Sequence, residues 1–496
     1  MSSRMPDSRT GPTGIVVLDG RSLPVADVVR LADGAARPVP GTEALKHVET
    51  SWDTARELAR AGRVYGRSTG VGANRTEDVP SEAAADHGLR LLRSHAGAIG
   101  EELPARQVRA MLAVRANQLL AGGAGLRPTV VTALCEALES GAYPLVHAFG
   151  SVGTGDIAPL AQLGLALAGE HPWRGAGRPP APQPLDNNDA LALISSNALT
   201  LGQSALALDE LRRLILATQV VAALSLLAVD GSYEAFAEPV HAARPHPGSV
   251  AVAARSRRLL GAPERPTPPL GRIQDPYGFR CVPQIHGPAH DAADALERTL
   301  AVELNAAAEN PLICAEDRAA YHHGGFYLAQ LALALDQFRL ALVQTARLSS
   351  SRLSALNEPA FTRLRPFLAD HEAASSGIMI LEYAAGAALG ELRSFSAPAS
   401  LGHAVLSRGV EEQASFASLA ARQTLRAADP YRLVVGCELV ATVRALRQRD
   451  LRPDPELPVG RAFALAEEVL DPDPTDRPLT DDVTAAAALL DRFTEL

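Results

Sequence analysis

The chain has 496 residues, enough for a large core, and its 47% hydrophobic and 21% charged residues are typical of a soluble globular protein. The formal net charge is −9 and no basic run or zinc-finger spacing occurs, so nothing favours binding to nucleic acid or an anionic membrane. Aromatic residues are only 4%, so Ala, Leu and Val must build most of the core, which favours close helix packing over sheet sandwiches.

The N-terminus is polar. Residues 1–14 are rich in Ser, Pro and Gly, which predicts a flexible tail and offers no apolar stretch for a signal peptide. Charged residues interrupt the longest apolar runs, so we expect no membrane-spanning helix and a cytoplasmic protein. Val16 to Leu18, followed by Asp19-Gly20, predicts a short strand and a turn.

Helical periodicity dominates after this strand. Apolar residues recur at helical spacings from Pro104 to Gly122, where two glycines end the pattern. Pro128 is suited to open the next helix and Gly141 to close it. The glycine- and proline-rich stretches 170–184 and 261–269 are expected to be loops.

Three further helices are predicted in the second half of the chain. Residues 326–356 contain neither Gly nor Pro, and these 31 residues would form one helix of about 45 Å. Residues 374–392 and 419–448 are also predicted to be helical, the latter with an interruption near Pro430. The sequence therefore predicts a mainly α protein, with a small N-terminal strand-containing region and a bundle of long helices. We expect an N-terminal helical region over 15–200, and a central bundle with C-terminal helices over 201–496.

Five polar segments interrupt this apolar background, and such loops are where sites are usually built. The first is Tyr65-Gly-Arg-Ser-Thr-Gly-Val-Gly72, whose three glycines permit unusual backbone angles. A nucleotide-binding loop is the rival interpretation, but the Rossmann spacing of glycines and a preceding strand are both missing.

The second segment, Gly150-Ser-Val-Gly-Thr-Gly-Asp156, predicts a loop that leads into a helix with Thr154 or Asp156 at its cap. The third is Leu193-Ile-Ser-Ser-Asn-Ala198, whose polar residues need partners of a structural or catalytic kind.

The fourth segment runs from Gln274 through Tyr277 and Arg280, and so supplies an amide, a phenol and a guanidinium. Arg280 can hold a carboxylate through two hydrogen bonds, or it can form a structural ion pair. The fifth, Glu411-Glu412-Gln413, offers two adjacent carboxylates, which are also common at a solvated helix start.

Two histidine pairs are metal-binding candidates on spacing alone. One is His286-Gly-Pro-Ala-His290, which lacks the glutamate of a zinc-protease motif, and the other is His322-His323. Neither pattern is specific, and we predict no metal.

Taken in order, these segments resemble the histidine, phenylalanine and tyrosine ammonia-lyases and aminomutases, from about Val16 to at least Leu446. The Tyr65 loop resembles the family's YGxNTGFG, and Ser94-His95-Ala-Gly-Ala-Ile-Gly100 its SHAxGxG. Gln274–Arg280 resembles QDxYSxR, and Asn305–Leu312 resembles NxxxDNPL. Gly150-Ser-Val-Gly and Gly-Asp-Ile-Ala-Pro-Leu-Ala resemble the two sides of the family's cofactor loop, and Pro398-Ala-Ser also fits.

The resemblance implies a nearly all-α fold and a homotetramer whose active sites combine loops from three subunits. It also implies a small-molecule substrate, and an internal methylidene-imidazolone (MIO) ring that the family makes from Ala-Ser-Gly, without a metal or external cofactor. By the same resemblance Tyr65 is the catalytic base, Arg280 holds the substrate carboxylate, and Tyr277 and Gln274 support the site. His95 matches a selectivity position, Phe326 a pocket wall and Glu411 an acidic site residue. A phenol with a pKa of about 10 would need a downward shift of roughly 3 units to act as a base at neutral pH.

The chain departs from the family in its cofactor loop. Where the family has GSVGASGD, this chain has Gly150-Ser-Val-Gly-Thr-Gly-Asp156, one residue shorter and without Ala-Ser-Gly. We therefore predict that the MIO ring is absent. The alternative is a variant ring from Gly153, Thr154 and Gly155, in which dehydration of the threonine leaves a bulkier ethylidene group.

Related changes lie in other segments. The family's NGTQ-like segment is here Ser195-Ser-Asn-Ala198, so Ser195 and Asn197 are candidate substrate-binding residues in an altered setting. The GNFH-like and QEDH-like segments are here Gly324-Gly-Phe-Tyr327 and Val410-Glu-Glu-Gln413.

Three hypotheses remain open at this point. The first, which we name as the expected function, is an ammonia-lyase- or aminomutase-like enzyme, with a variant ring, in which a tyrosine abstracts a proton and a small carboxylate-bearing substrate undergoes elimination or addition. The alternatives are a MIO-free enzyme repurposed for elimination, addition or cyclisation in secondary metabolism, and a non-catalytic homologue. Retention of Tyr65, Gln274, Tyr277 and Arg280 argues against the third, because a binding protein has no need to keep a base.

Overall fold

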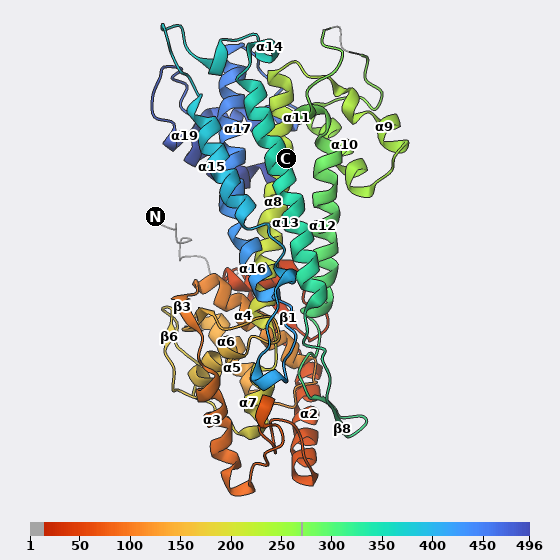
Figure 1. Cartoon of the computed structure of the whole chain (residues 1–496), viewed down its shortest axis with the longest axis vertical. Helices are drawn as coiled ribbons and strands as arrows, with labels where there is room; N and C mark the ends of the chain where they lie inside the picture. Colours follow the sequence, from red (N-terminus) through yellow and green to blue (C-terminus); the bar gives the residue numbers. More distant parts are fainter. Residues whose placement is uncertain (1–13, 269–270) are drawn as a thin grey trace. The chain divides into compact units, whose positions relative to one another are not determined.

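The computed structural model describes residues 14–268 and 271–496. The predicted tail therefore lies, except for Gly14, outside the described residues. The chain forms two compact units: unit 1 comprises residues 1–209, 297–335 and 398–425, and unit 2 comprises residues 210–296, 336–397 and 426–496. Helices dominate both units (Figure 1), as the sequence predicted.

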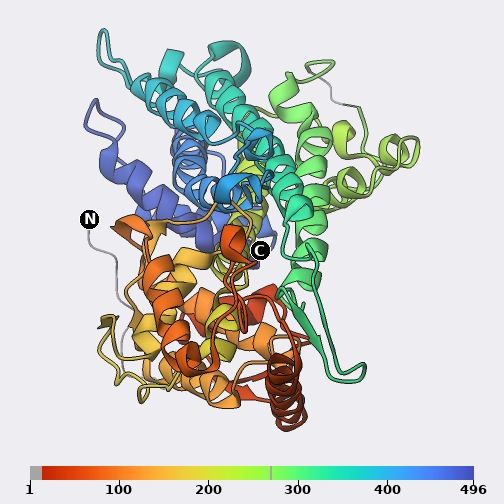
Figure 2. The ribbon, with the colours of Figure 1, turned by 60° about the horizontal axis from the view of Figure 1, so that its bottom comes forward.

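Unit 1 contains helices and small strands, and Figure 2 gives a second view of its red-to-yellow elements. Its β-structure consists of the parallel pair β1–β2 and the antiparallel pairs β3–β5, β4–β6 and β7–β8 within the described residues. The elements are β1 (Ile15–Leu18), α1 (Val25–Ala32), β2 (Arg37–Pro40), α2 (Thr42–Ala61), α3 (Ala84–His95), β3 (Ile99–Glu102), α4 (Ala105–Leu120), α5 (Pro128–Ser140), β4 (Tyr143–Pro144), β5 (His147–Phe149), α6 (Ile157–Leu167), β6 (Trp173–Arg174), α7 (Asn187–Ile194), β7 (Leu312–Cys314), β8 (Ala319–Tyr321) and α16 (Ala417–Arg426), with 3₁₀ turns at Gly72–Asn74, Ser81–Ala83, Ala399–Leu401 and Ser407–Gly409.

Unit 2 is built around long helices. The helices α8 (Ala198–Ala228), α12 (Val282–Glu303) and α13 (Ala329–Leu356) each have one part in unit 1 and the other part in unit 2. The others are α9 (Glu238–Ala242), α10 (Pro247–Leu260), α11 (Tyr277–Arg280), α14 (Pro359–Thr362), α15 (Ile380–Ser394), α17 (Ala428–Gln448), α18 (Pro458–Val469) and α19 (Thr480–Leu489), with 3₁₀ turns at Tyr233–Phe236, Pro366–Leu368 and Leu490–Glu495.

Most predicted elements of the first half are confirmed. The strand is β1, and the two helices after residue 104 are α4 and α5. Pro128 occupies the first turn of α5, and Gly141 ends the helix with a left-handed φ of 83°. The predicted loop 170–184 also contains the two-residue strand β6, which pairs with β4.

The predicted helices of the second half start in other places. Helix α13 begins at Ala329 rather than Phe326, because the carbonyl of Phe326 accepts a hydrogen bond from Asn197 instead. Helix α15 begins at Ile380 rather than residue 374, because Ala374 and Gly377 adopt positive φ angles of 61° and 52°.

The predicted interruption near Pro430 lies slightly earlier, between α16 and α17 at Ala427. Pro430 itself lies in the first turn of α17. Its missing N–H costs nothing there, because the first N–H groups of a helix have no partner within the helix.

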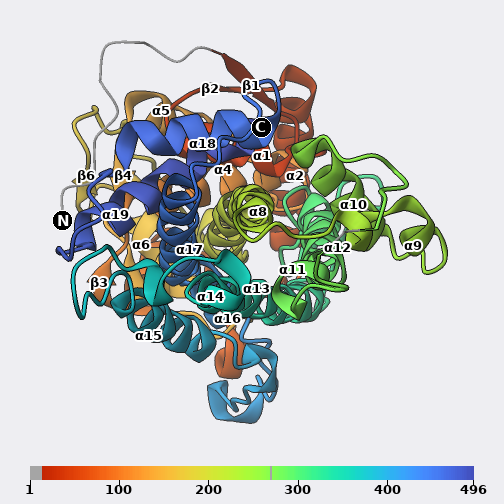
Figure 3. The same cartoon turned by 90° about the horizontal axis from the view of Figure 1, so that it is seen from above.

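Unit 2 has a polar network at the centre of its bundle, where α8, α13 and α17 meet (Figure 3). Glu438 and Arg352 are fully buried and pair through two hydrogen bonds of 2.6 and 2.8 Å. Ser225 and Ser349 donate to the same carboxylate, so its charge is compensated and hydrogen-bonded.

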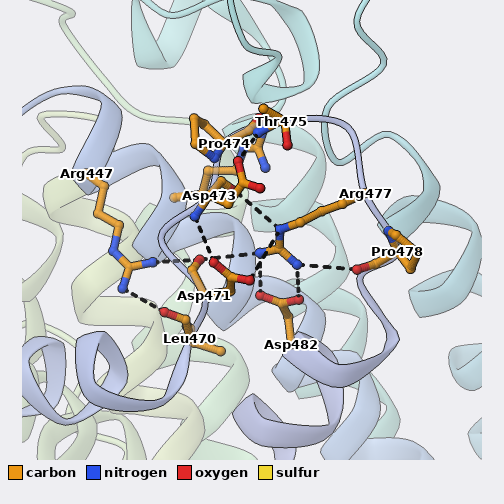
Figure 4. Close-up of polar contacts among 10 residues, drawn as sticks. Arg447, Leu470, Asp471, Asp473, Pro474, Thr475, Arg477, Pro478 and Asp482 are labelled. Atoms are coloured by element: carbon orange, nitrogen blue, oxygen red, sulfur yellow. Dashed lines mark hydrogen bonds and ion pairs between the residues drawn. The ribbon is translucent and has the colours of Figure 1, made fainter.

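The loop between α18 and α19 is held by arginines (Figure 4). Arg477 pairs with both carboxylate oxygens of Asp482, at 2.6 and 2.9 Å, while Arg447 donates to the carbonyls of Leu470 and Asp471. In the same loop, Asp476 accepts from the backbone amides of Ser376 and Gly377, which fixes the turn before α15.

One helical stretch, Asn187–Ala228, is long and apolar enough to cross a membrane by length and composition. However, 78% of its apolar window is buried inside the protein. A mostly buried helix of this kind is also found in the cores of water-soluble proteins, so the stretch is weak evidence for a membrane span.

Candidate active site

Unit 1 contains a cavity of about 450 Å³ that is lined by residues from several of the polar segments. Six predicted site residues line this unit 1 cavity: Tyr65, Thr154, Gly155, Ser195, Phe326 and Glu411. They come from parts of the chain that are far apart in sequence, so the fold brings most of the predicted loops of unit 1 to one place.

The loop that carries Tyr65 is fixed by a buried arginine. Arg67 is 2% exposed, and its guanidinium donates to the carbonyls of Gly125, Asn188 and Ala124. Burial lowers the pKa of Arg67 to about 10. The turn also needs a glycine at position 66, where φ is 68° and a Cβ would lie 2.0 Å from a methyl of Leu191.

The hydroxyl of Tyr65 accepts a hydrogen bond from its own loop. The backbone amide of Gly72 donates a hydrogen bond of 2.7 Å to the phenol oxygen. Burial raises the pKa of Tyr65 above its usual value of 10 and the nearby charge of Glu411 raises it further, while Gly72 and Arg75 act in the opposite direction. The downward shift that the sequence interpretation required is therefore not produced by the surroundings of Tyr65 in this chain.

The altered cofactor loop is anchored on both sides. Ser415 donates through Oγ to the carbonyl of Gly153 at 2.7 Å, and Ser151 donates through Oγ to the carbonyl of Gly155 at 3.1 Å. Asp156, at the start of α6, is fully buried and accepts from the backbone amide and the hydroxyl of Thr200 at 2.8 and 2.9 Å. Burial raises the pKa of the Asp156 carboxyl.

Residues 153–155 do not fit the ring-forming tripeptide of the resemblance. Ala-Ser-Gly occurs nowhere in the sequence. A Cβ at Gly153, as an alanine there would require, would lie 2.2 Å from Oγ of Ser415 and 2.8 Å from the backbone nitrogen of Ala417. The loop as folded therefore has no room for a side chain at Gly153, the residue that would be first in a variant tripeptide Gly153-Thr154-Gly155.

The Ser195 segment forms another side of the cavity. The backbone amide of Asn310 donates to Oγ of Ser195 at 3.0 Å, and Asn197 donates to the carbonyl of Phe326 at 2.7 Å. Arg115 donates to the carbonyl of Leu193 and forms a buried ion pair with Glu309 at 2.7 Å. These contacts fix the Ser195 segment to the segment that carries Asn310.

The remaining predicted residues do not line the unit 1 cavity. Asn197 and Gly153 lie in the loops that form its walls, and the ring of His95 contacts the carbonyl of Leu91 at 2.8 Å. Gln274, Tyr277 and Arg280 belong to unit 2, where the guanidinium of Arg280 lies 4.4 Å from the ring centre of the exposed Tyr277.

The sequence interpretation missed several cavity residues, or noted them for another reason. Arg75, Asn310, His322, Tyr327 and Glu412 all line the unit 1 cavity. His322 belongs to the His322-His323 metal candidate, but its ring packs edge-on to that of Tyr65, with centroids 6.4 Å apart. Among the described residues no group of three or more His, Cys, Asp or Glu side chains is arranged to hold a metal ion.

A larger groove of about 1030 Å³ lies in unit 2 between α13 and α15. Its lining is mostly apolar, with Arg347 and Arg393 as its charged residues, and it includes none of the predicted site residues. The chemistry-bearing side chains gather in the smaller cavity, which is therefore the better candidate for a catalytic site.

The chain is similar to known proteins over nearly its whole length. A family model described as aromatic amino acid lyase matches residues 23–468. Histidine ammonia-lyase from Geobacillus kaustophilus is 34% identical over 492 residues, covering 96% of this chain and 97% of that protein. The ergothioneine-degrading enzyme ergothionase from Treponema denticola has a TM-score of 0.89 and 26% identity, covering 97% of this chain and 99% of that structure. Tyrosine aminomutase from Streptomyces globisporus has a TM-score of 0.90 and 25% identity, covering 96% and 97%.

Proposed function

We propose, because this chain belongs to the aromatic amino acid lyase family, that the unit 1 cavity is the active site of a lyase-like enzyme acting on a small carboxylate-bearing substrate. The family and the helical fold expected from the sequence motifs are both confirmed. The observation that carries the proposal is the position of Tyr65, whose phenol lines the cavity beside Glu411 and Arg75 and accepts a hydrogen bond from Gly72.

In the proposed reaction Tyr65 removes a proton from a carbon of the substrate. The electron pair of that C–H bond forms the new double bond while the bond to the leaving group breaks, and addition is the reverse. The hydrogen bond from Gly72 stabilises the phenolate, whereas burial and Glu411 favour the phenol. A phenolate formed in a small fraction of molecules is a strong base, so we expect the reaction to be fastest at alkaline pH.

We further propose that the chemistry proceeds without a MIO ring. The support is the missing Ala-Ser-Gly. This favours a repurposed enzyme of secondary metabolism that catalyses elimination, addition or cyclisation. The alternative is a variant ring from Gly153, Thr154 and Gly155.

The mass of the purified protein decides between these two alternatives. A peptide map of residues 150–156 that shows the unmodified mass would support the MIO-free enzyme. Loss of two waters confined to that peptide would contradict it and identify a ring from Gly153-Thr154-Gly155. In that case release of ammonia from L-histidine and L-tyrosine should be tested first, because relatives of this chain are named for activities on these amino acids.

We expect Arg280, Gln274, Tyr277 and His95 to complete the site in a homotetramer with shared active sites, because none of the four lines the cavity of unit 1. Analytical ultracentrifugation tests the tetramer. Mixing of Tyr65→Phe and Arg280→Gln subunits tests the sharing, since shared sites should regain activity in the mixed oligomer and sites within one chain should not.

The hypothesis of a non-catalytic homologue is tested by Tyr65→Phe. A binding protein would keep its biological effect in this variant, whereas the proposed enzyme would lose its activity.

A further inference from the structure

Arg75 is a positively charged residue that lines the unit 1 cavity and belongs to none of the family motifs. It follows the 3₁₀ turn Gly72–Asn74, in the loop that begins at Tyr65, and its side chain is exposed and lines the cavity. Its charge acts on the Tyr65 phenol and lowers the pKa of that group, against the larger effects of burial and Glu411. The guanidinium is therefore close enough to Tyr65 to influence a charge that forms there.

This guanidinium has no acidic partner within the described part of the chain. Among residues 14–268 and 271–496, the guanidinium makes one hydrogen bond, a long contact of 3.4 Å from Nη1 to the carbonyl of Gly72. Two other arginines of the same stretch have strong partners: Arg63 pairs with Asp78 at 2.7 Å, and Arg67 donates to three buried carbonyls. Glu411 and Glu412 line the same cavity, but neither forms an ion pair with Arg75.

We propose that Arg75 binds the carboxylate of the substrate at the Tyr65 end of the unit 1 cavity. A guanidinium matches a carboxylate with two parallel hydrogen bonds, and Arg75 gives up only one long contact to form them. This inference rests on the proposed function, because it takes the cavity as the active site. It places the carboxylate beside Tyr65 through a residue of the same unit, in addition to the role that the resemblance gives to Arg280.

The two glutamates restrict the class of substrate. With one guanidinium and two carboxylates in its lining, the cavity repels a second negative charge on the ligand. A monocarboxylate whose other end is neutral or cationic, such as an amino acid, fits this arrangement. A dicarboxylate does not.

The experiment measures ligand binding and needs no knowledge of the natural substrate. Isothermal titration of the full-length protein with trans-cinnamate, with its uncharged amide cinnamamide and with the dicarboxylate fumarate compares wild type, Arg75→Gln, Arg75→Lys and Arg280→Gln. Arg63→Gln is the matched control, since it lies in the same stretch and outside the cavity lining.

We expect cinnamate to bind about tenfold more weakly to Arg75→Gln than to wild type. This is the effect expected when the charged hydrogen bonds between a partly exposed guanidinium and the ligand carboxylate are lost. Cinnamamide binding should be unchanged, Arg75→Lys should be intermediate, Arg63→Gln should behave as wild type, and fumarate should bind more weakly than cinnamate.

Two results would overturn the inference in different ways. If Arg75→Gln binds cinnamate as wild type does while Arg280→Gln loses it, Arg75 has no role in carboxylate binding and the proposed function stands. If wild type does not prefer cinnamate over cinnamamide, both the Arg75 inference and the proposal of a carboxylate-bearing substrate are wrong. The role of Tyr65 is then judged separately, from the activity of Tyr65→Phe.

Discussion

The backbone amide of Gly72 and the phenol oxygen of Tyr65 are joined by a hydrogen bond of 2.7 Å that closes the Tyr65 loop on itself. The amide proton points at the oxygen on which negative charge forms when the phenol loses its proton. Since Gly72 has a left-handed φ of 55°, this orientation depends on a residue that tolerates such a backbone angle. The loop thus both presents the phenol to the cavity and stabilises its ionised form.

Replacing Tyr65 by Phe should reduce the catalytic rate by roughly 100-fold to 10,000-fold, as expected for loss of a general base or acid. The measurement is the rate of product formation with the first substrate found in the amino acid and carboxylate screens. Tyr321→Phe is the control, because Tyr321 lies on β8, outside the cavity lining, and its hydroxyl donates to Asp317. Equal rates for wild type and Tyr65→Phe would remove Tyr65 from the mechanism.

The titration of Tyr65 should lie above pH 10, because burial and Glu411 raise its pKa. A tyrosine with a raised pKa in the folded state keeps its proton longer than in the unfolded state. Its contribution to stability is therefore complete below about pH 10 and is lost as the pH rises through the folded-state pKa. The phenolate absorbance of wild type minus that of Tyr65→Phe measures this pKa. If the difference in phenolate absorbance has its inflection below pH 10, the prediction that the pKa of Tyr65 is raised is wrong.

Replacing Glu438 by Leu should lower the free energy of unfolding by about 3–5 kcal/mol, because it leaves the fully buried Arg352 without its counter-charge. The double variant Arg352→Met with Glu438→Leu should recover a large part of this loss, since no unpaired charge remains in the core. Urea unfolding of the three variants and wild type tests the prediction. A double variant as unstable as Glu438→Leu would show that lost packing, rather than the stranded charge, is responsible.

His286 should make the protein sensitive to mild acid. Its ring is fully buried, and within the described residues neither ring nitrogen has a hydrogen-bond partner. Burial lowers the pKa of His286 well below its usual value, and the charges of Arg352 and His290 lower it further. The unfolded chain takes up a proton near pH 6.5 while the folded protein does not, so stability falls as the pH drops below that value.

The slope expected for this one group is at most about 1.4 kcal/mol per pH unit. Urea unfolding of wild type and His286→Leu between pH 8 and pH 5 measures it. The variant should lose less stability than wild type over this range, and parallel curves would show that another group causes the acid sensitivity.

The order of motifs along the chain was sufficient to predict the family and the mainly α fold, and local signals placed many elements. Pro128 and Gly141 predicted both ends of α5, because proline is compatible with a first helical turn and glycine with the left-handed residue that ends a helix. These signals are local, since the backbone angles of one residue decide them.

Only the tertiary structure decided the surroundings of the candidate site. Glu411 raises the pKa of Tyr65 from the other end of the chain, and Arg75 and His322 reach the cavity without belonging to a recognisable motif. Helices α13 and α15 also begin later than predicted. Asn197 donates to the carbonyl of Phe326 before α13, and Asp476 accepts from the amide of Gly377 before α15. Burial and electrostatic interactions depend on distances in space, and a pattern of residues along the chain does not contain those distances.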